Sequence, residues 1–412
     1  MLRLFRSRRF APLFVTQFLG AFNDNLFKTA MLFLITFHLA GVDVREAATM
    51  VTAAAGVFIL PFFLFSGIAG RVADARDKAV IARIVKLAEV GILSIGAVAL
   101  AIGSVPLLFA TLFGMGTHST VFGPVKYAIL PQHLQPGDLL SGTGLVEGGT
   151  FVAILLGQIA GGLLPVAWAA TAMGVAALAG VAASRFIPPA PPAPGAAPVD
   201  WNPLTASAAV VCEAFAVRPV WRATLAISWF WALGAVFTSE FVPLVKGDLG
   251  ATEAVATLFL AVFTVGIALG SAAVGRLLDG KVTARAAPWA ATVMALASID
   301  LLFAVHGAHG VAVGGPSGFV GSLAGCHVLA ALFVLAVAGG VFSVPLYGIL
   351  QTAGGAATRS GAVAANNIVN AAFQVGGTLL AGSAVAAGVP IPIVLAASGA
   401  SAFVLIPWLR GL

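Results

Sequence analysis

The sequence predicts an all-α membrane protein with twelve transmembrane helices in two six-helix bundles. Of its 412 residues, 60% are hydrophobic and only 9% are charged, whereas about a quarter of the residues of a soluble domain carry charge. The apolar runs last roughly 20 residues, as transmembrane helices require, while barrel strands alternate over about 10. A proline-rich segment then divides these runs into two equal sets.

The individual helices follow from the apolar runs and the breaks between them. We expect the first six near 11–39, 47–70, 80–103, 105–129, 139–164 and 166–187, and the next six near 220–244, 253–277, 286–306, 321–349, 359–384 and 388–408. Between the sets, the prolines of Pro188–Pro194 form a stiff connector. The predicted domains are an N-terminal six-helix bundle (1–187), a cytoplasmic Pro-rich linker (188–219) and a C-terminal six-helix bundle (220–412).

The distribution of lysine and arginine predicts the orientation in the membrane, because cytoplasmic loops carry an excess of both. With the N-terminus inside, the outer loops hold only Arg45 and Lys246. The cytoplasmic positions are Arg3, Arg6, Arg8, Arg9, Arg71, Arg76, Lys78, Arg83, Arg185, Arg218, Arg222, Arg276, Lys281, Arg285, Arg359 and Arg410. We therefore expect a multi-pass protein with both termini in the cytoplasm.

Short matches relate the two halves of the chain. Gly70-Arg71-Val72-Ala73-Asp74 follows the second expected helix, and Gly275-Arg276-Leu277-Leu278-Asp279 follows the eighth. Leu19-Gly20-Ala21 in the first helix likewise recurs as Leu233-Gly234-Ala235 in the seventh. Internal symmetry of this kind is typical of transporters built from two bundles, with a substrate site near the middle of the membrane.

Several chemistries are not indicated. The net charge of +6 follows membrane topology, so we expect no nucleic-acid partner. The two cysteines, Cys212 and Cys326, have neither CxxC spacing nor a histidine cluster, and no metal site is expected. The sequence contains no Walker A, GxSxG or HExxH motif. We expect no cofactor and no enzymatic activity.

The first expected helix carries polar residues at membrane depth, where a charged side chain costs about 2.5–3.5 kcal/mol on insertion scales. These residues are Asn23, Asp24, Asn25 and Lys28. Such residues normally face a protein interior or a watery cavity. Asp24 and Lys28 are four residues apart and share a helix face. They either neutralise each other as a structural pair or line a cavity and contact a substrate.

The turn after the second expected helix resembles the cytoplasmic signature of the major facilitator superfamily. Its wider sequence runs from Gly70 to Lys78, and Asp77 stands where the superfamily usually has glycine. A glycine permits close packing, and an aspartate can cap a helix or pair with a cation. We expect gating contacts from Gly70, Arg71, Asp74, Asp77, Lys78, Arg276 and Asp279. The alternative is a charged turn that only sets topology.

A second resemblance covers most of the chain. The segments that carry it are Gln17–Asn25, Ala73–Lys78, Lys86–Glu89, Phe122–Pro131, Glu147–Phe151, Ser228–Trp231, Val344–Tyr347 and Ala364–Asn370. Together they resemble the bacterial lysophospholipid transporter family of the major facilitator superfamily. The resemblance implies the major facilitator fold, the inner membrane, and transfer of lysophosphatidylethanolamine-type lipids to the cytoplasmic leaflet. Many relatives are fused to an acyltransferase and an acyl-carrier-protein synthetase. No such domain is visible up to Leu412, so we expect a separate enzyme to reacylate the lipid.

The head group of this cargo fits polar residues in both halves, because a phosphate prefers lysine or arginine and an amine prefers a carboxylate. The expected substrate-binding residues are Asn23, Asp24, Asn25, Lys28, Lys126, Tyr127, Glu147, Glu240, Asn366, Asn367 and Asn370. Each has a structural alternative. The asparagines can join helices by hydrogen bonds, and Lys126 can reach the interface. Glu147 can pack against a polar neighbour, and Glu240 can lie near the outer surface.

Three further polar residues lie within expected helices. Glu89 follows Lys86 by three residues and can pair with it. His118 in the fourth helix and Asp300 in the ninth are single polar residues, and the sequence assigns neither a role.

Two other functions remain open for the chain as a whole. It can be a proton-linked exporter of amphiphilic drugs, or a non-transporting membrane scaffold for an acyltransferase. Proton-linked efflux without movement of lysolipid would favour the exporter. Unchanged lysolipid uptake after substitution of Asp24 and Lys28 would favour the scaffold.

Overall fold

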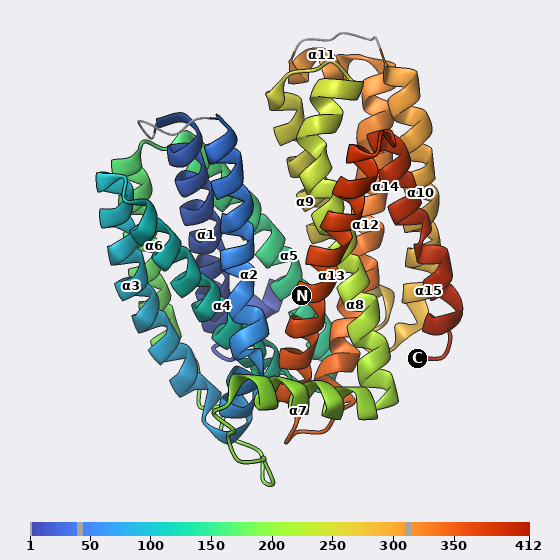
Figure 1. Ribbon diagram of the computed structural model, residues 1–412. Coiled ribbons are helices and arrows are strands. Elements are labelled where there is room, and N and C mark those ends of the chain that lie inside the picture. The colour runs from blue at the N-terminus through green and yellow to red at the C-terminus, as the bar shows by residue number, and fades with distance from the viewer. Residues whose placement is uncertain (1, 39–43, 310–314) are drawn as a thin grey trace. The chain divides into compact units, whose positions relative to one another are not determined.

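The structure is a computed structural model that describes residues 2–38, 44–309 and 315–412. Within these residues every regular element is helical (Figure 1). The first half contains η1 (Leu2–Arg6), α1 (Ala11–Phe33), η2 (Leu34–His38), α2 (Val44–Ala75), α3 (Lys78–Ile102), α4 (Val105–His133), α5 (Pro136–Leu163), α6 (Val166–Arg185) and α7 (Pro203–Ala216). The second half contains α8 (Arg218–Pro243), η3 (Leu244–Asp248), α9 (Glu253–Leu277), η4 (Ala284–Ala286), α10 (Ala287–Ala308), α11 (Pro316–Gly321), α12 (Leu323–Thr352), α13 (Arg359–Ala386), α14 (Ile391–Ala400) and α15 (Ala402–Leu409).

The predicted all-α membrane fold is confirmed. Among the described residues, 11 helical stretches are long and apolar enough to cross a membrane. They comprise α2 to α6, α8 continued through η3, α9, η4 with α10, α12, α13, and α14 with α15. α1 has 23 residues and is not one of these stretches. With α1, they agree with the twelve helices expected.

The structure differs from the expected helices at two places. The linker contains the helix α7, where Asn202 caps the N-terminus by accepting from the backbone N–H groups of Leu204 and Thr205. The last span is divided at Ser401 into α14 and α15. The end of the first expected span at residue 39 and the side chain of Arg45 lie outside what the structure describes.

The chain forms two compact units. The first contains Met1–Gly142, Val152–Val217 and Leu350–Ile368, and the second contains Thr143–Phe151, Arg218–Ile349 and Val369–Leu412. Residues of α5 and α13 thus belong to both units. The predicted domain boundaries at 187 and 220 stay a prediction, and the contacts group the linker with the first unit.

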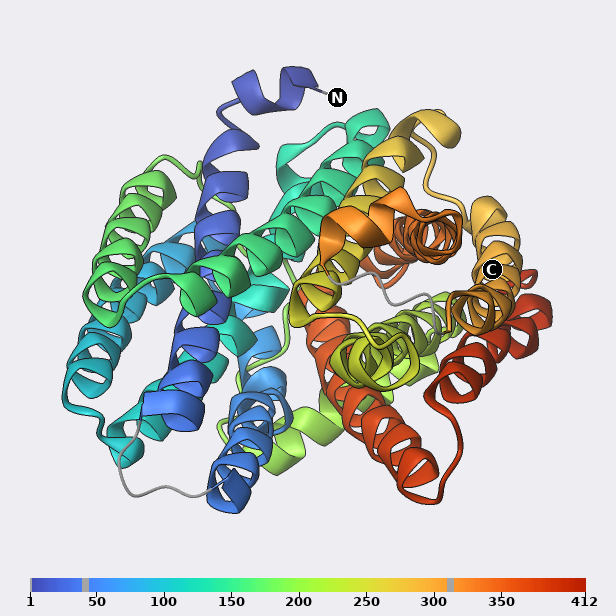
Figure 2. The same cartoon turned by 90° about the horizontal axis from the view of Figure 1, so that it is seen from above.

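In the first unit, α2 packs on α4, α3 packs on α4 and α6, and α1 packs on α6 (Figures 1 and 2). Their apolar faces meet in a core that includes Phe27, Met31, Leu93, Leu112 and Met173. The short helix α7 crosses the end of α2. Gly67 of α2 permits this crossing, because a Cβ there would overlap the backbone of Ala206 and Ser207.

The second unit has an aromatic core. Phe237 of α8 stacks on Phe263 of α9, with ring centroids 6.3 Å apart. Phe241 packs edge-on against Phe263 and Phe259, and Phe259 contacts Phe319 of α11. α10 packs on α14 and α15. Edge-to-face and offset aromatic pairs add about 0.5–1.5 kcal/mol beyond their buried area, so this cluster fixes the C-terminal part of α8 against α9.

The proline-rich part of the linker is bound to the first unit. Its carbonyl oxygens accept hydrogen bonds from Arg83 (to Ile187, 3.0 Å), Gln132 (to Pro191, 3.2 Å) and the Lys78 backbone N–H (to Ala190, 3.0 Å). The backbone N–H of Ala190 donates to Asp77 at 3.1 Å. Proline lacks this donor, so Ala190 supplies one of the few amides available in the segment. The stiff connector is therefore anchored to the ends of α3 and α4.

Candidate functional site

A buried polar cluster lies inside the first unit, and Glu89 of α3 is its centre. Asn23 of α1 donates from Nδ2 to Glu89 Oε1 at 2.8 Å. Lys86, one turn earlier on α3, forms an ion pair with Glu89 Oε2, as the spacing predicts. His118 Nε2 of α4 lies 3.3 Å from the same oxygen. The side chains of Lys86 and Glu89 are 0% exposed, so each charge depends on the other for compensation.

Lys86 reaches between two other helices. A Cβ on Gly180 of α6 would lie 2.6 Å from Lys86 Cε and 3.0 Å from its Nζ. A Cβ on Gly20 of α1 would lie 3.3 Å from the same Nζ. The two glycines therefore leave a slot between α1 and α6 that the lysine side chain occupies. This contact gives Gly20, part of the repeated Leu-Gly-Ala sequence, a structural role in the first unit.

Asp24 lies next to this cluster but has different partners. Its Oδ2 accepts a hydrogen bond from the Ser119 hydroxyl of α4. Its Oδ1 is buried and has no hydrogen-bond partner among the described residues. Lys28 lies one turn further along α1, with its Nζ 5.6 Å from the centre of the Phe58 ring of α2. Within the described residues no ion pair joins Asp24 to Lys28, so the two charges do not neutralise each other by contact.

This arrangement leaves one carboxylate oxygen and one ammonium near each other on α1. An unpaired buried acceptor is costly unless a partner satisfies it. A carboxylate can accept from an ammonium group, and a lysine can bind a phosphate. The pair can therefore bind a guest that carries both charges. Asn25, by contrast, donates to the Ala21 carbonyl of its own helix at 2.9 Å.

The other expected residues of the first unit lie on α4 and α13. The Lys126 ammonium lies 4.8 Å from the centre of the neighbouring Tyr127 ring. Asn366 is 0% exposed, and neither polar atom of its side chain has a hydrogen-bond partner among the described residues. Asn367 packs beside Gly123, where a Cβ would lie 2.9 Å from its Nδ2. All four residues were predicted to bind the substrate, and all four belong to the first unit.

The remaining expected residues belong to the second unit. Glu147 is buried on the part of α5 that packs on α9, where Gly148 approaches Ala268. Glu240 is buried near the end of α8. Asn370 of α13 accepts from the Ser228 hydroxyl of α8 at 2.6 Å. All three residues belong to the second unit, whereas Asp24 belongs to the first.

Aromatic residues of the second unit form a connected group. Trp231 of α8 donates from Nε1 to the Tyr347 hydroxyl of α12 at 2.8 Å. Its ring stacks on Phe151 of α5 at 5.5 Å between centroids, with 13° between the planes. Trp229 donates to the Ser401 hydroxyl at 2.8 Å, at the division between α14 and α15. Trp229 and Trp231 are therefore joined to the rest of the unit by specific hydrogen bonds.

The expected gating residues of the first half make specific contacts. The Asp74 carboxylate accepts the backbone N–H groups of Ser360 and Gly361, each at 2.9 Å, at the start of α13. Gly70 allows this approach, because its Cβ would lie 2.6 Å from Ala364 Cβ. Carboxylates at a helix N-terminus compensate unpaired N–H groups and the helix dipole. The contact therefore holds the first turn of α13 against the end of α2.

The neighbouring residues of the turn contact the linker. Arg71 forms an ion pair with Glu213 of α7. Asp77 caps α3 by accepting from the Ala79 backbone N–H at 2.8 Å, and it also accepts from Ala190. Lys78 is buried, and its ammonium has no hydrogen-bond partner among the described residues.

The equivalent turn of the second half has no matching contacts. Arg276 and Asp279 are exposed, and within the described part of the chain neither side chain makes a hydrogen bond or an ion pair. Asp279 has a φ of 50°, in the left-handed region that aspartate tolerates better than most residues. The repeat is therefore present in sequence, but its polar contacts form in one half only.

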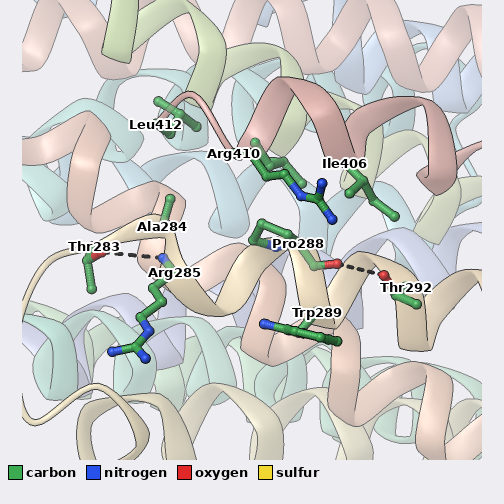
Figure 3. A pocket seen from close by; sticks show the side chains of 10 residues that line it. Thr283, Ala284, Arg285, Pro288, Trp289, Thr292, Ile406, Arg410 and Leu412 are labelled. Atoms are coloured by element: carbon green, nitrogen blue, oxygen red, sulfur yellow. Dashed lines mark hydrogen bonds between the residues drawn. The ribbon is translucent and has the colours of Figure 1, made fainter.

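A surface cavity of about 350 Å³ lies in the second unit, away from all the expected residues. It is lined by η4, the start of α10 and the end of the chain, including Arg285, Trp289 and Arg410. Figure 3 shows the guanidinium groups of Arg285 and Arg410 pointing in different directions. Because its charges do not converge, we do not assign the substrate site to this cavity.

Sequence reasoning did not place Lys86, Glu89, His118 and Ser119 in the site. The polar residues themselves were visible, since each lies in an otherwise apolar span. The i, i+3 spacing of Lys86 and Glu89 was the signal for their pair. No local pattern indicates that α3 and α4 meet Asn23 and Asp24, because these contacts link residues 66 and 95 positions apart.

Solved structures of low sequence identity share this fold. The human organic anion transporter MFSD10 (TETRAN) matches with a TM-score of 0.75 and 14% identity, covering 98% of this chain and 96% of its own. FucP, a major facilitator superfamily transporter in the outward conformation, matches with a TM-score of 0.69 and 13% identity, covering 97% of each chain. The chain therefore has the fold of the major facilitator superfamily, a class of membrane transporters.

Curated relatives narrow this class. The lysophospholipid transporter LplT of Serratia proteamaculans (strain 568) is 30% identical over 376 residues, which are 88% of this chain and 85% of the relative. LplT of Enterobacter sp. (strain 638) is 29% identical over 366 residues, 85% and 82% of the two chains. No protein-family model matches the chain. The chain belongs to the LplT lysophospholipid transporter family.

Proposed function

We propose that this protein transports lysophospholipids of the lysophosphatidylethanolamine type to the cytoplasmic leaflet of the bacterial inner membrane. The observation that carries the proposal is the state of Asp24 and Lys28. The two residues share a face of α1 without forming an ion pair, and Asp24 Oδ1 has no protein partner among the described residues. Membership of the LplT family supports the choice of cargo.

The chemistry of the cargo matches this pair. Lysophosphatidylethanolamine carries a cationic amine, an anionic phosphate and one acyl chain. Asp24 would accept from the amine, and Lys28 would bind the phosphate, as charge-assisted hydrogen bonds. A guest of this kind supplies each protein charge with the partner that it lacks. In a site without bulk water these bonds are stronger than on a surface.

The other expected residues have unequal support as cargo ligands. Asn366 is the strongest of them, because its buried amide has no hydrogen-bond partner among the described residues. Asn23 and Asn25 are already engaged by Glu89 and by Ala21, so we propose that they shape the site. Lys126, Tyr127, Glu147, Glu240, Asn367 and Asn370 remain candidates for cargo contact or for helix packing.

Transport would proceed by alternating access of two six-helix bundles. We propose that Gly70, Arg71, Asp74, Asp77 and Lys78 form the cytoplasmic gate, which rests on the Asp74 cap of α13. Arg276 and Asp279 would contribute in another state, since they are exposed in this one. No coupling ion is required if a separate acyltransferase and acyl-carrier-protein synthetase consume the cargo inside. This proposal includes cytoplasmic termini, which follow from the charge distribution.

The test is a leaflet assay in vesicles that contain the purified protein. Fluorescent lysophosphatidylethanolamine is added outside, and an impermeant quencher then destroys the fluorescence that remains in the outer leaflet. We expect protein-dependent protection of the label, and its loss in Asp24→Asn and in Lys28→Met. Asp300→Asn is the matched control, because it removes a carboxylate from the exposed Asp300–His327 pair of the second unit. Protection that is absent with the wild-type protein would exclude the proposed function.

A further inference from the structure

Asn23 and Asp24 are neighbours on α1, and His118 and Ser119 are neighbours on α4. Asn23 and His118 both approach Glu89, at 2.8 Å and 3.3 Å. Their chain neighbours, Asp24 and Ser119, contact each other directly. The Asp24–Ser119 hydrogen bond therefore lies next to the contacts that Asn23 and His118 make with Glu89. A rotation or slide of α1 that broke the Asn23–Glu89 bond would also move Asp24 away from Ser119.

Glu89 links more of the unit than these two helices. Its ion pair with Lys86 brings the lysine into the slot left by Gly20 and Gly180. Four helices, α1, α3, α4 and α6, therefore meet at one buried carboxylate and its partner. The Asn23–Glu89 hydrogen bond and the Lys86–Glu89 ion pair hold α1 against α3, while Asn23 Oδ1 and His118 Nδ1 have no hydrogen-bond partner among the described residues.

We propose that Glu89 is a positioning residue for cargo recognition. It fixes the rotation and depth of α1 against α4, so that Ser119 binds Asp24 Oδ2 and Oδ1 is left for the amine of the lysolipid. Glu89 does not contact the cargo and acts through Asn23 and His118. The proposal rests on the proposed function, because Asp24 is a cargo ligand only in that function.

The test must separate positioning from the electrostatics of a buried ion pair. Removing Glu89 alone would leave the Lys86 charge without compensation and destabilise the fold. Both charges are therefore removed together. Lys86→Met/Glu89→Gln keeps an acceptor for Asn23, whereas Lys86→Met/Glu89→Leu has similar volume and no acceptor. The two double variants differ only in the ability of residue 89 to hold Asn23 and His118.

The measurement is the half-saturating concentration of lysophosphatidylethanolamine in the vesicle assay, separated from the maximal rate. We expect the Gln variant to stay within about threefold of the wild type, because it retains the bond to Asn23. We expect the Leu variant to raise half-saturation by about tenfold, or ~1.4 kcal/mol. Ser119→Ala keeps the Glu89 network and removes the donor to Asp24, so it should raise half-saturation similarly.

The outcomes are distinguishable. A purely structural role would lower the amount of folded protein and hence the maximal rate, with half-saturation unchanged in every variant, and this result would overturn the proposal. Equal half-saturation in the Gln and Leu variants would also overturn it. Should the Leu variant not fold, a wild-type half-saturation in Ser119→Ala decides against the proposal, and a raised value supports it. A wild-type protein that moves no lysolipid would overturn the proposed function itself.

Discussion

One oxygen of the Asp77 carboxylate accepts two backbone N–H groups, that of Ala79 in α3 and that of Ala190 in the linker. Asp77 stands where the superfamily pattern usually has glycine. A glycine at this position could make neither hydrogen bond from a side chain. The departure from the pattern therefore coincides with a linker that is bound along its proline-rich part.

Asp77→Ala should release this part of the linker. A hydrogen bond of this kind contributes about 1 kcal/mol, so we expect the Ala190 amide to exchange its hydrogen roughly fivefold faster. Mass spectrometry of hydrogen exchange over the linker peptide checks this. Asp77→Asn is the control, because its side-chain oxygen can still accept from Ala190. Equal protection in the wild type and the alanine variant would show that Asp77 does not hold the linker.

Asp74→Asn should lower the thermal stability of the protein in detergent. The carboxylate accepts two backbone N–H groups at the start of α13, and the amide replaces one of these oxygens by a donor. The buried mismatch should cost about 1–3 kcal/mol. Asp279→Asn changes the equivalent but exposed residue of the repeat and should stay within about 0.5 kcal/mol. Similar losses in both variants would contradict the assigned contact.

Gly67→Ala should destabilise the contact between α2 and α7. Its new Cβ would overlap the Ser207 and Ala206 backbone, and overpacking of this kind costs about 1–3 kcal/mol. Gly56 lies in the same helix, and a Cβ there would meet nothing within 4 Å. Gly56→Ala should therefore leave stability unchanged or raise it by roughly 1 kcal/mol. Unfolding midpoints of the two variants give the comparison, and a stable Gly67→Ala would argue against tight packing of α7.

Lys28→Met should strongly slow transport without destabilising the fold. Among the described residues Lys28 forms no ion pair, and methionine retains an apolar stem beside Phe58. We expect a loss of at least about tenfold in the initial rate, corresponding to ~1.4 kcal/mol, with an unfolding midpoint no lower than that of the wild type. Lys246→Met breaks an exposed ion pair with Glu253 and should transport normally. A Lys28→Met variant with normal transport would remove Lys28 from the site.

Much of the fold was predictable because membrane spans are local features. A long apolar run defines each helix, and α9 begins and ends at the residues expected. The polar stretch of α1 was equally visible, since Asp24 and Lys28 interrupt an apolar run. The Gly-Arg-x-x-Asp sequence indicated that Asp74 could cap a helix. Its partners, Ser360 and Gly361, could not, because they lie 286 and 287 residues away.

The remaining features depend on tertiary contacts that leave no local pattern. Glu89 becomes a centre only when α1 and α4 pack on α3. The repeat predicted equivalent contacts in the two halves. Asp279 occupies the position equivalent to Asp74, but its side chain has no partner among the described residues. The prolines of the linker predicted a stiff connector, and the helix α7 within the same linker was not predicted. Asn202 is a typical N-cap residue, so residues 200–205 contain a signal for the start of this helix.

The anchored linker has a mechanical consequence. Residues 187–191 are bound to α3 and α4, and α7 is bound to α2, so both ends of the intervening loop are fastened to the same unit. The length of that loop therefore adds no slack where the chain passes from Val217 to Arg218, which is one of several places where it passes between the two units. Extra glycines inserted between residues 192 and 199 should be tolerated. The same insertion after Val217 would instead lengthen the chain where it passes from the first unit into α8.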